Sequence, residues 1–169
     1  MSEAAQVAQL TQWVRQHSES LLRICFIQLA DRALAEDALQ ETFLKAWRAL
    51  SGNYDRSIRN DKAWLSRIAL NVCHDIQRSR WIRHVNFSKA LEDLPPSLVA
   101  VQPEDRALLL DIHMLPDKYR QVLILYYYQH LTLRDVGEVL GLDSSTVHYR
   151  LKKAQQCLKR KLTEEVDAP

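Results

Sequence analysis

The chain has 169 residues, enough for one medium domain or two small ones, and its 47% apolar content argues against wholesale disorder. Its net charge of +2 is smaller than a dedicated non-specific DNA-binding protein would carry. With three glycines, five prolines and apolar residues at a period near 3.6, the chain is predicted to be all-α.

The first two predicted elements are helices over residues 7–30 and 33–50; the first contains the apolar run LLRICFIQLA. The Ser-Gly-Asn sequence at residues 51–53 ends the second helix. Its apolar residues share one face and are Ala35, Leu39, Phe43, Ala46 and Leu50. The opposite face carries Asp37, Gln40, Glu41 and Leu44. With Asp31 and Glu36 nearby, this acidic face suggests a protein-binding surface, and an ordinary solvated face is the alternative.

A third helix is predicted over residues 61–83, after a polar loop over 54–60. Its apolar stripe consists of Leu65, Ile68, Ala69, Val72 and Ile76. A polar stripe consists of Arg67, Asn71, His74 and Arg78. Basic residues continue with Arg80, Arg83 and Lys89, which suggests a nucleic-acid surface. Trp64 near the helix start fits either a stacking platform for a base or a core position.

The remaining chain is predicted to form a second helical domain after a linker that contains Pro95 and Pro96. One helix ends before Pro116, another covers residues 117–129, and two more follow over 131–162. We therefore expect two small helical domains, at residues 1–85 and 104–169, joined by a linker over 86–103.

Residues 131–154, LTLRDVGEVLGLDSSTVHYRLKKA, have the pattern of a helix-turn-helix. Thr132 and Asp135 have capping-box spacing, Gly141 can end the first helix, and Asp143 or Ser144 can cap the second. Gly137 lies inside the first helix, where close approach of the second helix explains a residue without a side chain.

The second helix of this motif divides into an apolar and a polar stripe. The apolar stripe is Val147, Leu151, Ala154, Leu158 and Leu162. The polar stripe is Ser145, His148, Tyr149, Lys152, Lys153 and Gln156. These donors and positive charges can contact base edges and phosphates. A solvated helix face is the alternative, but the preceding cap, glycine and turn favour DNA recognition.

Four segments in order resemble the extracytoplasmic-function (ECF) sigma factors of bacterial RNA polymerase. They are EDALQETFLKAW (36–47), AWLSRIALNVCHDIQRSR (63–80), LPDKYRQVLIL (115–125) and the helix-turn-helix. The resemblance covers nearly the whole chain. It implies a factor that directs core polymerase to promoters by binding the −35 duplex and by melting and capturing the −10 element. It also implies an anti-sigma factor as a partner.

The resemblance implies three surfaces. Docking on the clamp helices of the polymerase beta-prime subunit falls to Asp37, Gln40, Glu41 and Leu44. Recognition of −10 DNA falls to Arg59, Asn60, Asp61, Trp64, Arg67, Asn71, Arg78 and Arg80. Recognition of −35 DNA falls to Thr132, Ser145, Thr146, His148, Tyr149, Arg150, Lys152 and Lys153. Many family members carry Lys-Ser or Arg-Ser where this chain has His148 and Tyr149, so the base preference stays open.

Two other functions account for parts of the sequence less well. A free-standing helix-turn-helix regulator of duplex operator DNA accounts for the C-terminal half but gives the acidic helix no role. An enzyme is disfavoured because the six histidines are scattered, and His17, His113 and His130 are expected at the surface or at helix ends.

The remaining expectations concern compartment and cofactors. Cys25, Cys73 and Cys157 lack a CxxC pattern, which favours a reducing cytosol and disfavours disulfides. Cys73 and His74 diverge on a helix, so we expect no metal, no other cofactor and no small-molecule substrate. No signal peptide or membrane span is evident, so we expect a cytoplasmic protein, held at the inner membrane where its anti-sigma factor is membrane-bound.

Overall fold

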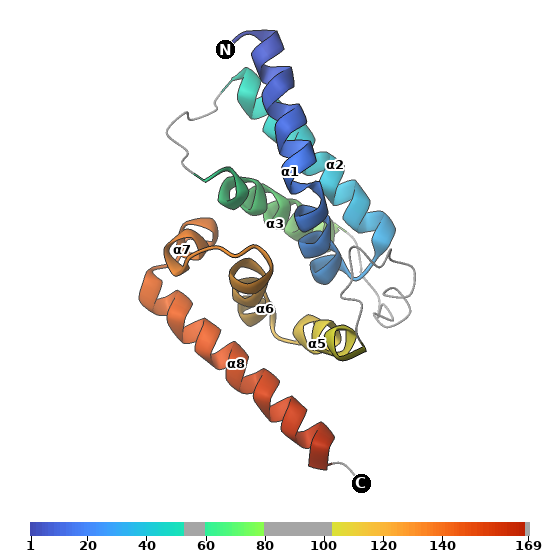
Figure 1. Cartoon of the computed structure of the whole chain (residues 1–169), viewed down its shortest axis with the longest axis vertical. Helices are drawn as coiled ribbons and strands as arrows, with labels where there is room; N and C mark the ends of the chain where they lie inside the picture. The colour runs from blue at the N-terminus through green and yellow to red at the C-terminus, as the bar shows by residue number, and fades with distance from the viewer. Residues whose placement is uncertain (53–59, 80–102, 168–169) are drawn as a thin grey trace. The chain divides into compact units, whose positions relative to one another are not determined.

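The computed structural model describes residues 1–52, 60–79 and 103–167, the last range with side chains for residues 108–159 only (Figure 1). The chain folds into two compact units, Met1–Leu98 and Val99–Pro169. All the regular elements of the described residues are helical, which confirms the all-α prediction. The predicted linker over 86–103 lies outside the described residues except for its last residue.

The first unit contains α1 (Glu3–Leu29), α2 (Arg32–Ser51) and α3 (Asp61–Ser79), which pack pairwise (Figure 1). Helix α1 begins four residues before the predicted start because Ser2 caps it: its Oγ accepts a hydrogen bond from the Ala5 N–H at 3.2 Å. It ends at Ala30, whose left-handed backbone lets its N–H donate to the Phe26 carbonyl at 2.8 Å.

The core of this unit is built from all three helices. Large side chains come from α1 and α3, and Trp13, Leu21, Ile24 and Leu65 have no exposed surface. Helix α2 contributes small residues, so it can approach the other two helices closely. Its fully buried positions are Ala35, Ala38, Thr42 and Ala46. Leu39 and Phe43 of the predicted apolar face are only half-buried, because the buried stripe is centred on the small residues.

The start of α3 packs against α1 through an aromatic pair. The ring centroids of Trp13 and Trp64 are 5.3 Å apart with an interplanar angle of 50°. His17 lies one turn after Trp13 on α1, half-buried and in mid-helix, so the helix-end alternative of its prediction does not hold. Burial lowers the pKa of the His17 imidazole, and the Lys62 ammonium lowers it further.

The second unit contains α5 (Pro103–His113), α6 (Asp117–Leu123), η1 (Ile124–Tyr128), α7 (Leu133–Leu140) and α8 (Ser144–Asp167). The helix predicted over 117–129 forms as α6 followed directly by η1, whose π-helical winding the sequence did not predict. The Gln129 N–H donates to the Ile124 carbonyl at 3.2 Å, five residues back. Over five residues, the apolar pattern of a π-turn cannot be told from that of an α-turn.

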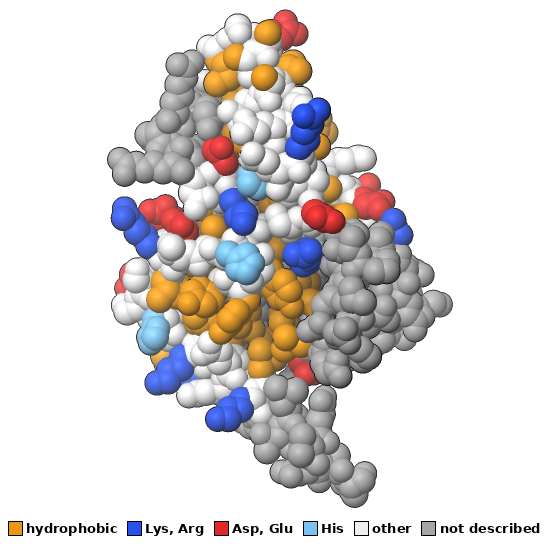
Figure 2. Space-filling view, in the orientation of Figure 1, with side chains coloured by type: hydrophobic (Ala, Val, Ile, Leu, Met, Phe, Trp, Pro, Cys, Tyr) orange, Lys and Arg blue, Asp and Glu red, His pale blue; other side chains and the backbone are white. Residues whose placement is uncertain are grey.

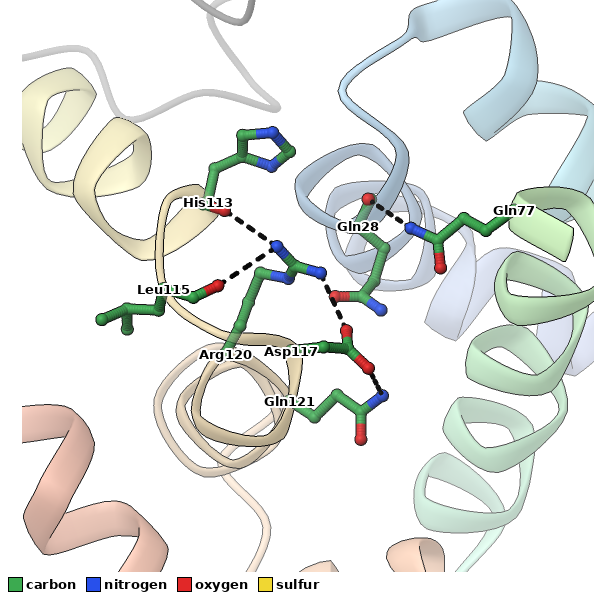
Figure 3. Close-up of polar contacts among 7 residues, drawn as sticks. All are labelled: Gln28, Gln77, His113, Leu115, Asp117, Arg120 and Gln121. Atoms are coloured by element: carbon green, nitrogen blue, oxygen red, sulfur yellow. Dashed lines mark hydrogen bonds and ion pairs between the residues drawn. The ribbon is translucent and has the colours of Figure 1, made fainter. Parts of the chain in front are cut away.

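Arg120 joins the end of α5 to the start of α6 (Figure 3). Its Nη1 donates to the His113 carbonyl at 2.8 Å and to the Leu115 carbonyl at 3.5 Å. Its Nη2 bonds Asp117 Oδ1 at 2.8 Å, and the other Asp117 oxygen accepts from Gln121 Nε2 at 2.8 Å. The guanidinium therefore satisfies carbonyls at the α5 terminus that no helical N–H reaches.

Candidate nucleic-acid interface

The helix-turn-helix forms with the predicted caps. Thr132 Oγ1 accepts from the Asp135 N–H at 3.1 Å and starts α7. Of the two candidate caps for α8, Asp143 takes the role, since its Oδ1 accepts from the Thr146 N–H at 2.9 Å. Hydrogen bonds from the Thr146 hydroxyl and from the Thr146 N–H lower the pKa of the Asp143 carboxyl. Gly141 adopts the left-handed conformation, φ 69°, that ends α7.

Gly137 allows the turn to close over α7. A Cβ at this position would lie 2.5 Å from the Leu142 carbonyl oxygen and 3.6 Å from Val147 Cγ2. The sequence predicts that the second helix of the motif, α8, approaches Gly137 closely. The nearest atom belongs instead to Leu142 in the turn, and the nearest atom of α8 is Val147 Cγ2. The Leu142 N–H donates to the Gly137 carbonyl at 2.9 Å, which holds the turn in this position.

Helix α8 presents the predicted stripes to opposite sides. Val147, Leu151 and Ala154 are buried. The polar stripe is exposed at Ser145, His148, Tyr149, Lys152 and Gln156 and half-buried at Lys153. Thr146 and Arg150 are half-buried between the stripes. Figure 2 shows Lys, Arg and His side chains along the course of α8 on the face in view.

Helix α2 presents its predicted docking stripe to solvent. Asp37 and Gln40 are exposed, Leu44 is 49% exposed, and the Glu41 side chain is 42% exposed. Two grooves flank this stripe. One, of about 440 Å³ between α2 and α3, is lined by Leu34, Asp37, Glu41, Lys45, Val72, Asp75, Ile76 and Ser79. The other, of about 530 Å³ between α1 and α2, is lined by Val7, Leu10, Thr11, Gln40, Phe43, Leu44 and Trp47.

The polar face of α3 exposes Arg67, Asn71 and Arg78, which are four and seven residues apart and therefore share one side of the helix. Asp75 adds an acidic group that the sequence interpretation missed. Its carboxylate lies 3.9 Å from Arg78 Nη2 and 3.8 Å from Lys45 Nζ on α2. The spacing of Asp75 and Arg78 could have indicated the first contact, whereas the second depends on how α2 packs on α3.

The other residues predicted to bind −10 DNA lie at the start of α3 or outside the described residues. Asn60 caps α3, because its Oδ1 accepts from the Ala63 N–H at 3.0 Å. Asp61 is the first helical residue, and Trp64 is half-buried against Trp13. Arg59 and Arg80 lie outside the described residues.

The fold brings together two cysteines that lie far apart in the sequence. Cys25 of α1 and Cys73 of α3 are both fully buried and free, whereas Cys157 is half-buried. A hydrogen bond with Cys73, and then burial, raise the pKa of the Cys25 thiol well above its usual range. A thiol in this state is a poor nucleophile. No group of three potential metal ligands occurs among the residues that the structure describes.

Comparison with known proteins identifies both units. Residues 13–83 match the model of Sigma-70 region 2, and residues 106–158 match that of Sigma-70 region 4. The ECF RNA polymerase sigma factor SigW of Bacillus subtilis is 28% identical over 88% of this chain and 86% of its own length. The ECF RNA polymerase sigma factor SigL of Mycobacterium tuberculosis is 30% identical over 95% of this chain and 93% of its own length.

Solved structures agree at the level of the fold. CnrH, solved in complex with the cytosolic domain of CnrY, is 25% identical with a TM-score of 0.71, over 94% of this chain and 89% of its own. The sigma factor RpoE of Bartonella quintana, solved with the anti-sigma factor NepR, is 21% identical with a TM-score of 0.72, over 92% and 97%.

The helix-turn-helix, together with the matches to Sigma-70 regions 2 and 4, identifies a DNA-binding transcription factor of the sigma class. The chain belongs to the ECF family of RNA polymerase sigma factors. It therefore acts in promoter recognition and transcription initiation with RNA polymerase. The free-standing regulator is not favoured, because it leaves the region 2 match over residues 13–83 without a role. Within the described residues, no helix is both long and apolar enough to cross a membrane.

Proposed function

We propose that the three surfaces divide the work of promoter recognition among named residues. Residues 1–85 dock on polymerase and capture the −10 strand, residues 104–169 bind the −35 duplex, and residues 86–103 link them. Docking on the beta-prime clamp helices uses Asp37, Gln40, Glu41 and Leu44. The observation that carries this proposal is their shared exposure on one side of α2. Exposed carboxylates there can accept charge-assisted hydrogen bonds from arginines of a partner.

The groove between α1 and α2 supports docking at this position. Leu44 and Gln40 lie on its wall, next to the apolar rings of Phe43 and Trp47. A partner helix that places a basic group against Glu41 can therefore bury apolar surface at the same time. Arg48 lies 3.7 Å from Glu41 at the protein surface, and this weak ion pair is easily exchanged for an intermolecular one.

The −10 surface suits single-stranded DNA, and the −35 surface suits duplex DNA. Arg67, Asn71 and Arg78 line up along α3, where they can follow a single strand whose bases have left the stack. Opening each base-pair step costs about 1.4 kcal/mol in stacking, which captured bases and polymerase contacts must offset. The polar stripe of α8 instead suits duplex DNA in the major groove.

Three further parts of the proposal concern partners, place and chemistry. The complex of a related fold with the anti-sigma factor NepR supports an anti-sigma factor as a partner here. We place the protein in the cytoplasm, held at the inner membrane when that partner is membrane-bound. The factor carries no catalytic site of its own and takes no cofactor, and polymerase supplies the chemistry of RNA synthesis.

Replacing Glu41 by Lys tests the docking surface. Titration of full-length E41K against purified core polymerase should show loss of binding, because the stripe then repels basic partner groups. Glu19→Lys is the matched control: it makes the same charge change at an exposed position of α1, outside the acidic face of α2, and binding should persist. Circular dichroism should show unchanged helicity for both. Retained affinity of E41K would refute the docking role.

A further inference from the structure

The most exposed aromatic side chain on the −35 surface is Tyr149. It is 57% exposed, so much of its ring lies in solvent and does not pack against the protein. Its neighbours on the polar stripe are hydrophilic, namely Ser145, His148 and Lys152. An apolar ring at the centre of a polar, basic face is unusual for a surface that contacts only water.

The position of Tyr149 along α8 places it near base edges. The helix begins at Ser144, after the Asp143 cap, so Tyr149 lies in its second turn. In a helix-turn-helix, the first turns of the second helix enter the major groove, and later turns approach the phosphates. Lys153 lies four residues further along on the same side, which places it nearer the rim of the groove.

A contact between the Tyr149 and Lys153 side chains determines which part of the tyrosine ring remains open to DNA. Lys153 Nζ lies 5.8 Å from the centroid of the Tyr149 ring, as in a cation–π pair. The ammonium therefore occupies one face of the ring on the C-terminal side. The remaining face and edge of the ring point to solvent and can make apolar contacts with DNA.

We propose that Tyr149 recognises a thymine of the −35 element through the 5-methyl group of that base. Lys153, held by the ring, contacts the adjacent phosphate. The inference rests on the proposed −35 role of α8. Thymine is the base that presents a methyl group in the major groove, and apolar side-chain surface is what recognises it. The ring carbons of Tyr149 make this contact, and the hydroxyl group is not needed for it.

The test uses holoenzyme assembled from core polymerase and the full-length chain. Duplex promoter fragments with a randomised −35 element are selected for binding, and each thymine of the recovered sequence is replaced in turn by deoxyuridine, which lacks the methyl group. At one position this replacement should weaken binding about fourfold, the value of one buried methyl group. Tyr149→Phe should keep that penalty, and Tyr149→Ala should abolish it at that position alone.

Lys153→Gln serves as the contrasting variant. It should weaken binding to thymine and deoxyuridine fragments equally and reduce the salt dependence by about one phosphate contact. Because both side chains are at the surface, circular dichroism should show folded variants. An element without thymine, no deoxyuridine penalty, or an unchanged penalty in Tyr149→Ala would overturn the inference. Failure of wild-type holoenzyme to select any −35 sequence would instead overturn the proposed function of α8, and the inference with it.

Discussion

Single atoms decide whether the helix-turn-helix can close. The Leu142 carbonyl oxygen occupies the space that a Cβ on residue 137 would need, 2.5 Å away, so glycine is required there for steric reasons. Gly141 is required for a different reason, since its φ of 69° is strained for residues with a side chain. The same residue type thus serves packing at one position and backbone conformation at the other.

The two glycines give a matched prediction at this scale. Gly137→Ala should lower the free energy of unfolding by about 3 kcal/mol, because backbone must move to relieve the overlap. Gly141→Ala should lower it by about 1 kcal/mol, since a Cβ there meets open space and only the left-handed strain remains. Urea unfolding of the full chain measures both. A Gly137→Ala variant as stable as Gly141→Ala would contradict the packing argument.

At the scale of elements, side chains both cap helix ends and join neighbouring helices. Asn60, Thr132 and Asp143 each cap a helix with a side-chain oxygen. Arg120 joins α5 to α6 through two carbonyls and one carboxylate. Asp75 of α3 lies within ion-pair distance of Lys45 on α2 and of Arg78 on α3, so one carboxylate links the two helices.

Arg120 provides the prediction for elements. Its side chain is only 11% exposed, so Arg120→Met should leave partly buried carbonyls unpaired and cost about 2 kcal/mol of stability. The matched control is Arg134→Met on α7, where the side chain is 85% exposed and pairs with Glu138 at 3.5 Å. That change should cost less than about 0.5 kcal/mol. Equal losses in thermal or urea unfolding would argue against a specific role for the Arg120 cluster.

At the scale of the whole molecule, the chain is two compact units with separate cores. Leu65 is fully buried in the first unit, and Leu123 is 1% exposed in the second. Separate cores suit a promoter-recognition factor, because each unit keeps its own surface in shape through its own buried side chains.

Separate cores predict separate responses to core mutations. Leu65→Ala should cost about 3 kcal/mol and speed amide hydrogen exchange in α1, α2 and α3. Leu123→Ala should do the same in α6, α7 and α8. Hydrogen-exchange mass spectrometry of the full chain locates each effect. Spread of either perturbation across both units would contradict independent cores.

Local signals in the sequence explain which predictions succeeded. The 3.6 period and the caps indicated most of the helices, and the Thr132, Gly141 and Asp143 pattern placed the turn of the helix-turn-helix correctly. Exposure of the docking stripe on α2 and of the polar stripe on α8 followed from amphipathicity. The π-helix η1 was missed because its signal is a hydrogen-bond shift of one residue, without a sequence pattern of its own.

What the sequence by itself determined is therefore the set of helices and the faces they expose, because both depend on neighbours within a turn or two. Only the tertiary structure decided which distant side chains meet. The contacts of Trp13 with Trp64, Cys25 with Cys73 and Lys45 with Asp75 all join different helices. They depend on how the three helices pack against one another, and no single segment contains that information.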